Sequence, residues 1–126
     1  EEDGLAQAYA TVGAITMNGD TITSMVIDAV QANVNFDVSG QITTDLSLPQ
    51  ASKNQLGDDY GMRVASSIGK EWYEQAASFA AYVTGKTPAE VSGIAVTEDG
   101  KAADADLAAS VTVSIGDFQT LVDKAA

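Results

Sequence analysis

The feature that most constrains the fold is a strand–turn–strand pattern in the first third of the chain. Residues 10–17 have the composition of a β-strand, and strand-like residues resume at 21–30. Between them, Asn18-Gly19-Asp20 supplies a turn that can adopt positive φ. The sequence therefore predicts an antiparallel hairpin at the start of the chain.

Both faces of this hairpin are predicted to be at least partly covered. In the second strand, Met25 and Ile27 fall on one side, whereas Val26 and Val30 fall on the other. A strand with apolar residues on both sides is typical of a sheet that is packed on both faces. A second hairpin-like unit follows, with its turn at residues 37–40.

Helices are predicted in the second half of the chain. Residues 48–67 have the character of a long loop with one helical turn at 55–60. Apolar residues then recur at spacings of four, three and four, on one face of a helix over residues 69–84: Trp72, Ala76, Phe79 and Val83. Gly85 suits the C-terminal cap of this helix. The capping-box sequence Thr87-Pro88-Ala89-Glu90 predicts a second, short helix.

The C-terminal segment is predicted to pass from a strand into a helix. Residues 110–114 alternate polar and apolar side chains, and Ser114 with Asp117 has the pattern of a helix N-cap. An apolar helical stripe follows: Phe118, Leu121, Val122 and Ala125. Together these patterns predict a single α+β domain over residues 1–126. We expect an antiparallel sheet of N-terminal hairpins, helices packed on it, and a strand-to-helix C-terminal ending.

The charge of the chain excludes one class of partner. Eighteen acidic and six basic residues give a net charge of −12, and the basic residues are scattered. Nucleic-acid binding depends on clustered Lys and Arg that release counterions from phosphates, so no nucleic-acid partner is expected. The same charge disfavours anionic lipid headgroups. We therefore expect membrane attachment only through a lipid anchor upstream of this chain.

The chain contains no cysteine and no histidine. Thiol nucleophiles, disulfides, imidazole bases and the common zinc sites are therefore unavailable to it. Any chemistry must rest on carboxylates, Lys, Tyr or a bound cofactor. This composition removes most hydrolase classes and favours a protein that is not an enzyme.

Residues 106–126, DLAASVTVSIGDFQTLVDKAA, resemble the closing segment of the FMN-binding domain of exported, membrane-associated flavoproteins and lipoproteins. Six residues match that family's pattern without a gap: Asp106, Thr112, Ser114, Phe118, Val122 and Ala125. The Ser-Gly-Ala triplet of the pattern is replaced by Ala109-Ser110-Val111. Residues 9–28 resemble the first hairpin of the same family. The whole chain is also similar to bacterial lipoproteins described as membrane-anchored immunogens.

The resemblance implies a flavin site around Thr112. In the family, the matching threonine can carry FMN through a phosphoester bond, and the start of a helix offers free N–H groups to a phosphate. Here Val111 replaces a small residue, and Asp117 adds a carboxylate to the first helical turn. We therefore expect FMN to bind noncovalently and weakly, or not at all. The candidate cofactor-binding residues are Thr112, Ser114, Ser110, Tyr60 and Tyr73.

Tyr60 and Tyr73 belong to this set because an isoalloxazine ring needs flat apolar walls. Trp72 lies on the apolar helical face, so we expect it in the core. Glu71 and Glu74 lie one helical turn apart and would support hydrolysis only with a partner across a cleft. A solvated surface pair is the simpler interpretation.

Two functional hypotheses follow. The first is an extracytoplasmic, surface-anchored module of the FMN-binding-domain type that binds a ligand or assists electron transfer. The alternative is a cofactor-free structural or protein-interaction domain of a bacterial lipoprotein. The expected partner is a small-molecule ligand or a membrane-associated protein. No metal site is expected, because the acidic residues at 98–106 lack the spacing of a calcium-binding loop.

Overall fold

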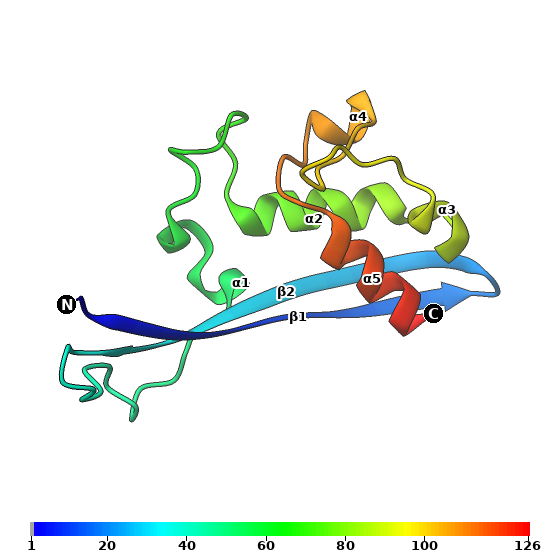
Figure 1. The fold of residues 1–126 in the computed structure, drawn as a ribbon. Helices are drawn as coiled ribbons and strands as arrows, with labels where there is room; N and C mark the ends of the chain where they lie inside the picture. Colours follow the sequence, from blue (N-terminus) through cyan, green and yellow to red (C-terminus); the bar gives the residue numbers. More distant parts are fainter. Residues whose placement is uncertain (1) are drawn as a thin grey trace.

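β1 (Gly4–Asn18) and β2 (Thr21–Phe36) form a long two-stranded antiparallel sheet in the computed structural model, which describes residues 2–126. The helices lie on one side of this sheet, so the predicted α+β class is confirmed (Figure 1). Gly19 in the connecting turn has φ of 64°, as the turn residues predict.

The second predicted hairpin is reduced to a turn closed by a single bridge. β2 continues without a break to Phe36, which then forms one isolated antiparallel bridge with Ile42. The Asp37 carboxylate accepts hydrogen bonds from the N–H groups of Ser39 and Gln41, both at 3.0 Å. These bonds hold the predicted turn, but within residues 2–126 β1 and β2 are the one pair of strands.

A β-bulge decides which residues of β2 are buried. Met17 pairs with Ile22 and Thr16 pairs with Ser24, so Thr23 is an extra residue in β2. The bulge changes the phase of the alternation. Consequently residues with both even and odd numbers face the helices: Ile22, Met25, Ile27 and Ala29.

The helices cover only this face of the hairpin. On the opposite face, Val12 is 56% exposed and Val26 is 65% exposed. The prediction that both faces are at least partly covered is therefore wrong at Val12 and Val26, although Val30 on the same face is half-buried. Alternation reports the apolar character of a face, and it does not report what packs against that face.

Helices make up most of the remaining regular structure. They are α1 (Lys53–Leu56), the 3₁₀ helix η1 (Gly57–Tyr60), α2 (Trp72–Val83), α3 (Pro88–Ser92), α4 (Ala105–Ala108) and α5 (Gly116–Ala125). α1 and η1 occupy the predicted helical turn, and α3 carries the predicted capping box. α2 begins later than predicted because Glu71 is its N-cap. Within the described part of the chain, no helix has the length and apolar character needed to cross a membrane.

Residues 110–114 do not form a regular strand. No sequence pattern predicted α4. After this helix the chain turns, and Val111 in the turn is fully buried. Ser114 then forms one isolated bridge with Lys101 before α5 begins. The alternation in this segment therefore reflects burial of a loop against the core.

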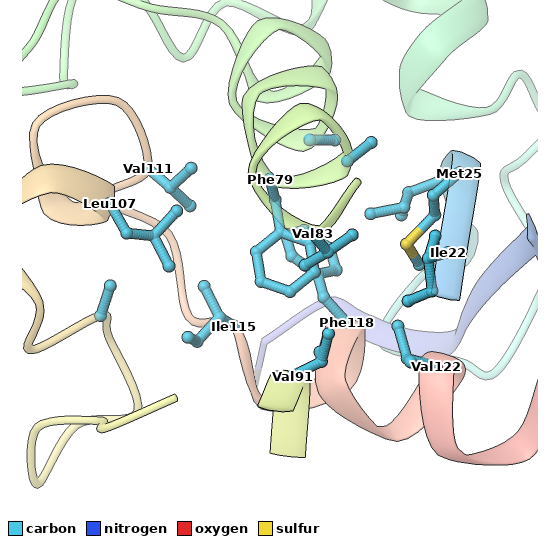
Figure 2. Close-up of a cluster of buried hydrophobic side chains, with 14 of the residues drawn as sticks. Ile22, Met25, Phe79, Val83, Val91, Leu107, Val111, Ile115, Phe118 and Val122 are labelled. Atoms are coloured by element: carbon cyan, nitrogen blue, oxygen red, sulfur yellow. The ribbon is translucent and has the colours of Figure 1, made fainter. Parts of the chain in front are cut away.

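The core lies between the sheet, α2 and the C-terminal segment (Figure 2). The ring centroids of Phe79 in α2 and Phe118 in α5 are 5.1 Å apart. Trp72 meets Phe118 edge to face at 6.0 Å, which confirms Trp72 as a core residue. Val122 is fully buried beside them and Leu121 is half-buried, so α5 docks through three of the four residues of the predicted stripe, whereas Ala125 is exposed.

Candidate functional site

A hollow of about 240 Å³ opens at the edge of the core, and we name it the Lys53 pocket. It is lined by residues from β1, α1, η1, α2 and the start of α5: Tyr9, Thr11, Lys53, Tyr60, Met62, Trp72, Val113, Ser114, Asp117 and Phe118. Aromatic and apolar walls with a few convergent polar groups are typical of small-molecule sites.

The side chain of Lys53 is buried without a carboxylate partner. The residue is 7% exposed, and no salt bridge among residues 2–126 includes it. Its ammonium donates a hydrogen bond to the Tyr9 hydroxyl at 2.9 Å. The ammonium lies 4.7, 5.0 and 5.1 Å from the ring centroids of Tyr9, Tyr60 and Trp72. The rings stabilise the cation, but an ammonium has three donors, so an anion in the pocket can accept from it.

α1 is fixed to β2, and this holds Lys53 in place. Ser52 and Gln55 form a capping box around the short helix. The Asn54 N–H donates to the Asp28 carboxylate at 3.1 Å, and the Asn54 side-chain amide donates to a backbone carbonyl of β2 at 2.8 Å. Because one helical turn is not stable alone, these bonds determine where the Lys53 ammonium lies.

Two hollows of similar size adjoin the Lys53 pocket. One, of about 220 Å³, shares Tyr9, Thr11 and Asp117 with it and continues along α5. The other, of about 250 Å³, shares Lys53 and Tyr60.

A larger hollow, of about 520 Å³, lies at α3. Its lysine, Lys86, lies 4.8 Å from the ring centroid of Tyr82. Glu90 and Asp104 also line this hollow, and Lys86 is only half-buried. The Lys53 pocket is therefore the stronger candidate, because its cation is buried and lies against three aromatic rings.

Two of the five predicted site residues meet in this pocket, namely Tyr60 and Ser114. Tyr73 lines a separate hollow against β2. Its hydroxyl donates to the Asp58 carboxylate at 3.2 Å, and this hydrogen bond raises the pKa of Tyr73. The structure therefore separates Tyr73 from the predicted ligand site.

Gln75 of α2 explains why Thr112 is not available to a ligand. The Gln75 side chain is fully buried, and its carbonyl accepts from the Thr112 N–H at 2.7 Å and the Thr112 hydroxyl at 3.0 Å. It also accepts from the Val113 N–H at 3.2 Å. The Ser110 hydroxyl donates to a carbonyl of α4 at 3.3 Å. Neither Thr112 nor Ser110 lines the Lys53 pocket.

The predicted N-cap of α5 is wrong. The N-cap residue is Ile115, and no side chain caps this helix. The Ser114 hydroxyl instead donates to the Gly100 carbonyl at 3.3 Å. Gly100 has φ of 80°, and a Cβ there would lie 2.8 Å from the Ser114 hydroxyl oxygen, so this contact requires glycine. The exposed Asp117 is left facing the Lys53 pocket.

Glu71 and Glu74 hold the loop before α2 and do not form a catalytic pair. The buried Glu71 carboxylate accepts from the N–H groups of Met62 and Arg63 at 2.8 and 2.7 Å. The Glu74 carboxylate accepts from the Glu71 N–H at 2.8 Å and pairs with Arg63 at 2.9 Å, and these contacts lower the pKa of Glu74. Hydrolysis therefore has no support. Across residues 2–126, no group of three or more acidic side chains is placed to hold a metal ion.

Sequence patterns do not single out Lys53 and Gln75, although each leaves a signal. Lys53 is the first basic residue of a strongly acidic chain. Gln75 lies next to Ala76 on the apolar stripe of α2, where a polar side chain must find hydrogen-bond partners. No feature of the sequence marks Tyr9, because its hydrogen bond with Lys53 depends on where α1 lies in the fold.

Comparison with known proteins gives one partial relative. A stretch of 40 residues is 48% identical to chlorophenol reductase of Desulfitobacterium hafniense and spans 32% of this chain. The match covers 12% of that protein. No family model matches the chain, and no solved structure matches it.

Proposed function

We propose that this chain is an accessory module that binds a planar, anionic small molecule noncovalently in the Lys53 pocket. The observation that carries the proposal is the buried ammonium of Lys53, which lies against three aromatic rings and pairs with no carboxylate among residues 2–126. Burying a charge costs free energy unless it is compensated. An anionic ligand supplies that compensation, and the ring walls receive its flat apolar part.

FMN is the ligand that the family resemblance suggests, and the residues of the pocket fit it in part. The Lys53 ammonium would pair with an anionic group of FMN, and the Tyr60 ring would lie against the isoalloxazine. The Ser114 hydroxyl, which donates to the Gly100 carbonyl, would accept a hydrogen bond. Bound FMN would supply the redox chemistry. The Asp117 carboxylate lines the same pocket and opposes a phosphate, so we expect weak binding.

Covalent attachment is not part of the proposal. The hydroxyl and N–H of Thr112 are both bound to Gln75, and the residues before Thr112 depart from the family's triplet. We infer that the intact mass of the chain made in its native host contains no flavin. An added FMN mass that disappears in Thr112→Ala would contradict this inference.

The setting of the module is also a proposal. The resemblance to exported lipoproteins and the net charge of −12 support an extracytoplasmic, membrane-anchored protein with its anchor outside this chain. The partial match to a protein named as a reductase is in keeping with a role in electron transfer.

Titration with FMN, followed by flavin fluorescence, tests the site. Lys53→Met removes the ammonium and retains the length of the side chain. We expect FMN to bind about tenfold more weakly to this variant, near 1.4 kcal/mol. The matched control is Lys70→Met, which removes the same charge from a half-exposed lysine paired with Glu74. An equal loss of FMN affinity in both variants would mean that the net charge of the protein, and not the Lys53 pocket, governs FMN binding.

The alternative function is a cofactor-free interaction domain. One observation favours it, namely the exposed apolar residues Val12 and Val26 on the uncovered face of the sheet. A purified protein that is colourless and unchanged by FMN would support this alternative. The two functions are compatible within one chain, because the Lys53 pocket and the uncovered face lie on opposite sides of the sheet.

A further inference from the structure

The Lys53 pocket is lined by a second charged group, the carboxylate of Asp117. Asp117 lies in the first turn of α5 and is exposed. No salt bridge among residues 2–126 includes Asp117, although Lys124 lines the adjoining hollow together with it. One hollow is thus lined by two opposite charges, those of Lys53 and Asp117, that form no salt bridge with each other.

The walls and the size of the pocket restrict what can lie beside these two charges. The rings of Tyr9, Tyr60 and Trp72 lie against the Lys53 ammonium and give the hollow flat aromatic walls. Its volume of about 240 Å³ is below the range of about 300–1,000 Å³ that is usual for drug-sized ligands. The pocket therefore suits one flat ring system with a short polar chain.

We propose that the ligand of the Lys53 pocket is a small aromatic zwitterion, such as an aromatic amino acid, whose carboxylate pairs with Lys53 and whose protonated amine pairs with Asp117. The proposal rests on the proposed function, in which Lys53 binds an anionic group, and it adds the second charge of the ligand. A ligand that is only anionic satisfies Lys53 but is repelled by Asp117. A zwitterion is attracted by both side chains, so the two charges of the pocket select for it.

The charge of the whole chain acts in the same direction. A net charge of −12 repels an anion from a distance, whereas a zwitterion has no net charge to be repelled. Salt separates this general effect from the effect of Asp117. At about 0.15 M salt, exposed charges more than about 8 Å away are largely screened. Affinities measured at that ionic strength therefore report mainly the groups that line the pocket.

Tryptophan and indole-3-propionate test the proposal, because the two molecules share the indole ring and the carboxylate and differ only in the amine. A two-dimensional NMR titration of the labelled chain at about 0.15 M salt gives both dissociation constants. The amide signals of Thr11 and Ser114, which line the pocket, report binding. We expect tryptophan to bind about threefold more tightly than indole-3-propionate, a modest factor because the Asp117 carboxylate is exposed.

Asp117→Asn removes the carboxylate and should abolish this preference, since tryptophan then binds more weakly and indole-3-propionate more tightly. The matched control is Asp106→Asn, which removes the same charge from an exposed residue that does not line the pocket. The control should retain the preference for tryptophan. Lys53→Met should weaken the binding of both ligands about tenfold. Circular dichroism verifies that each variant is folded.

The proposal is overturned if indole-3-propionate binds as tightly as tryptophan, or if the preference survives in Asp117→Asn. It is also overturned if Asp106→Asn loses the preference equally. In these cases a weaker binding of both ligands to Lys53→Met would still support the anion site. If neither ligand gives saturable shifts at about 10 mM, the zwitterion proposal is wrong, and the FMN titration of Lys53→Met judges the anion site separately.

Discussion

Replacement of Gln75 by methionine should destabilise the protein by about 3 kcal/mol. Methionine keeps the length and apolar stem of glutamine, so little volume is lost from the core. The substitution removes the carbonyl that accepts two N–H groups and one hydroxyl from Thr112 and Val113. It also removes the amide that donates to the Lys70 carbonyl and the Ser66 hydroxyl.

The magnitude follows from the number of groups left without a partner. An unpaired buried donor costs about 1–3 kcal/mol, and the lower value applies here because Thr112 and Val113 are half-buried. Three lost acceptor contacts therefore give about 3 kcal/mol. Urea unfolding followed by the fluorescence of Trp72, the single tryptophan, measures the change at constant m-value.

Ser78→Ala is the control for this measurement. Ser78 lies in the same helix, and its hydroxyl donates to a carbonyl one turn earlier at 3.0 Å. Its loss should change stability by less than about 0.5 kcal/mol, because alanine favours the helix. A loss below about 1 kcal/mol in Gln75→Met would refute the idea that Gln75 joins α2 to the segment before α5.

Three further predictions concern the core, acid stability and ligand charge. Phe118→Ala should cost about 3–5 kcal/mol in urea unfolding, since Phe118 packs between Trp72 and Phe79; a loss under about 1 kcal/mol would make α5 peripheral. The pKa of Glu74 is lowered in the folded state, so its contribution is present above about pH 4.3 and is lost as the pH falls further. The urea midpoint of Glu74→Gln should accordingly fall less between pH 5.5 and pH 3 than that of the unaltered chain, and an identical fall would contradict this. Asp117→Asn should bind FMN about three- to tenfold more tightly, most of all at low salt, and an unchanged affinity would place the anionic group elsewhere.

Local sequence signals predicted the hairpin and α2 well. The turn at Gly19 requires a residue that tolerates positive φ, and the stripe from Trp72 to Val83 has one helical period. Both features depend on residues close together in the sequence. The bulge at Thr23 was not predictable, because it depends on which register best buries Ile22.

The candidate site was predicted only in part because its residues come from distant segments. Tyr60 and Ser114 were expected near a ligand, and they share the Lys53 pocket. Thr112 does not line this pocket, because it is bound to Gln75, which lies 37 positions away in the sequence. The pattern of residues 110–114 carries no information about that contact. The contact between Lys53 and Tyr9 likewise joins residues that are far apart in the sequence, so no local pattern predicts it.

The most direct test of the central claim is a two-dimensional NMR titration of the labelled chain with FMN. If the ligand binds beside Lys53, the amide signals of Thr11, Lys53 and Ser114 shift together and saturate at one dissociation constant. Signals of Glu90, in the larger hollow at α3, stay in place. Saturable shifts that gather around Glu90, or no shifts at about 1 mM FMN, would contradict the assignment of the Lys53 pocket as the ligand site.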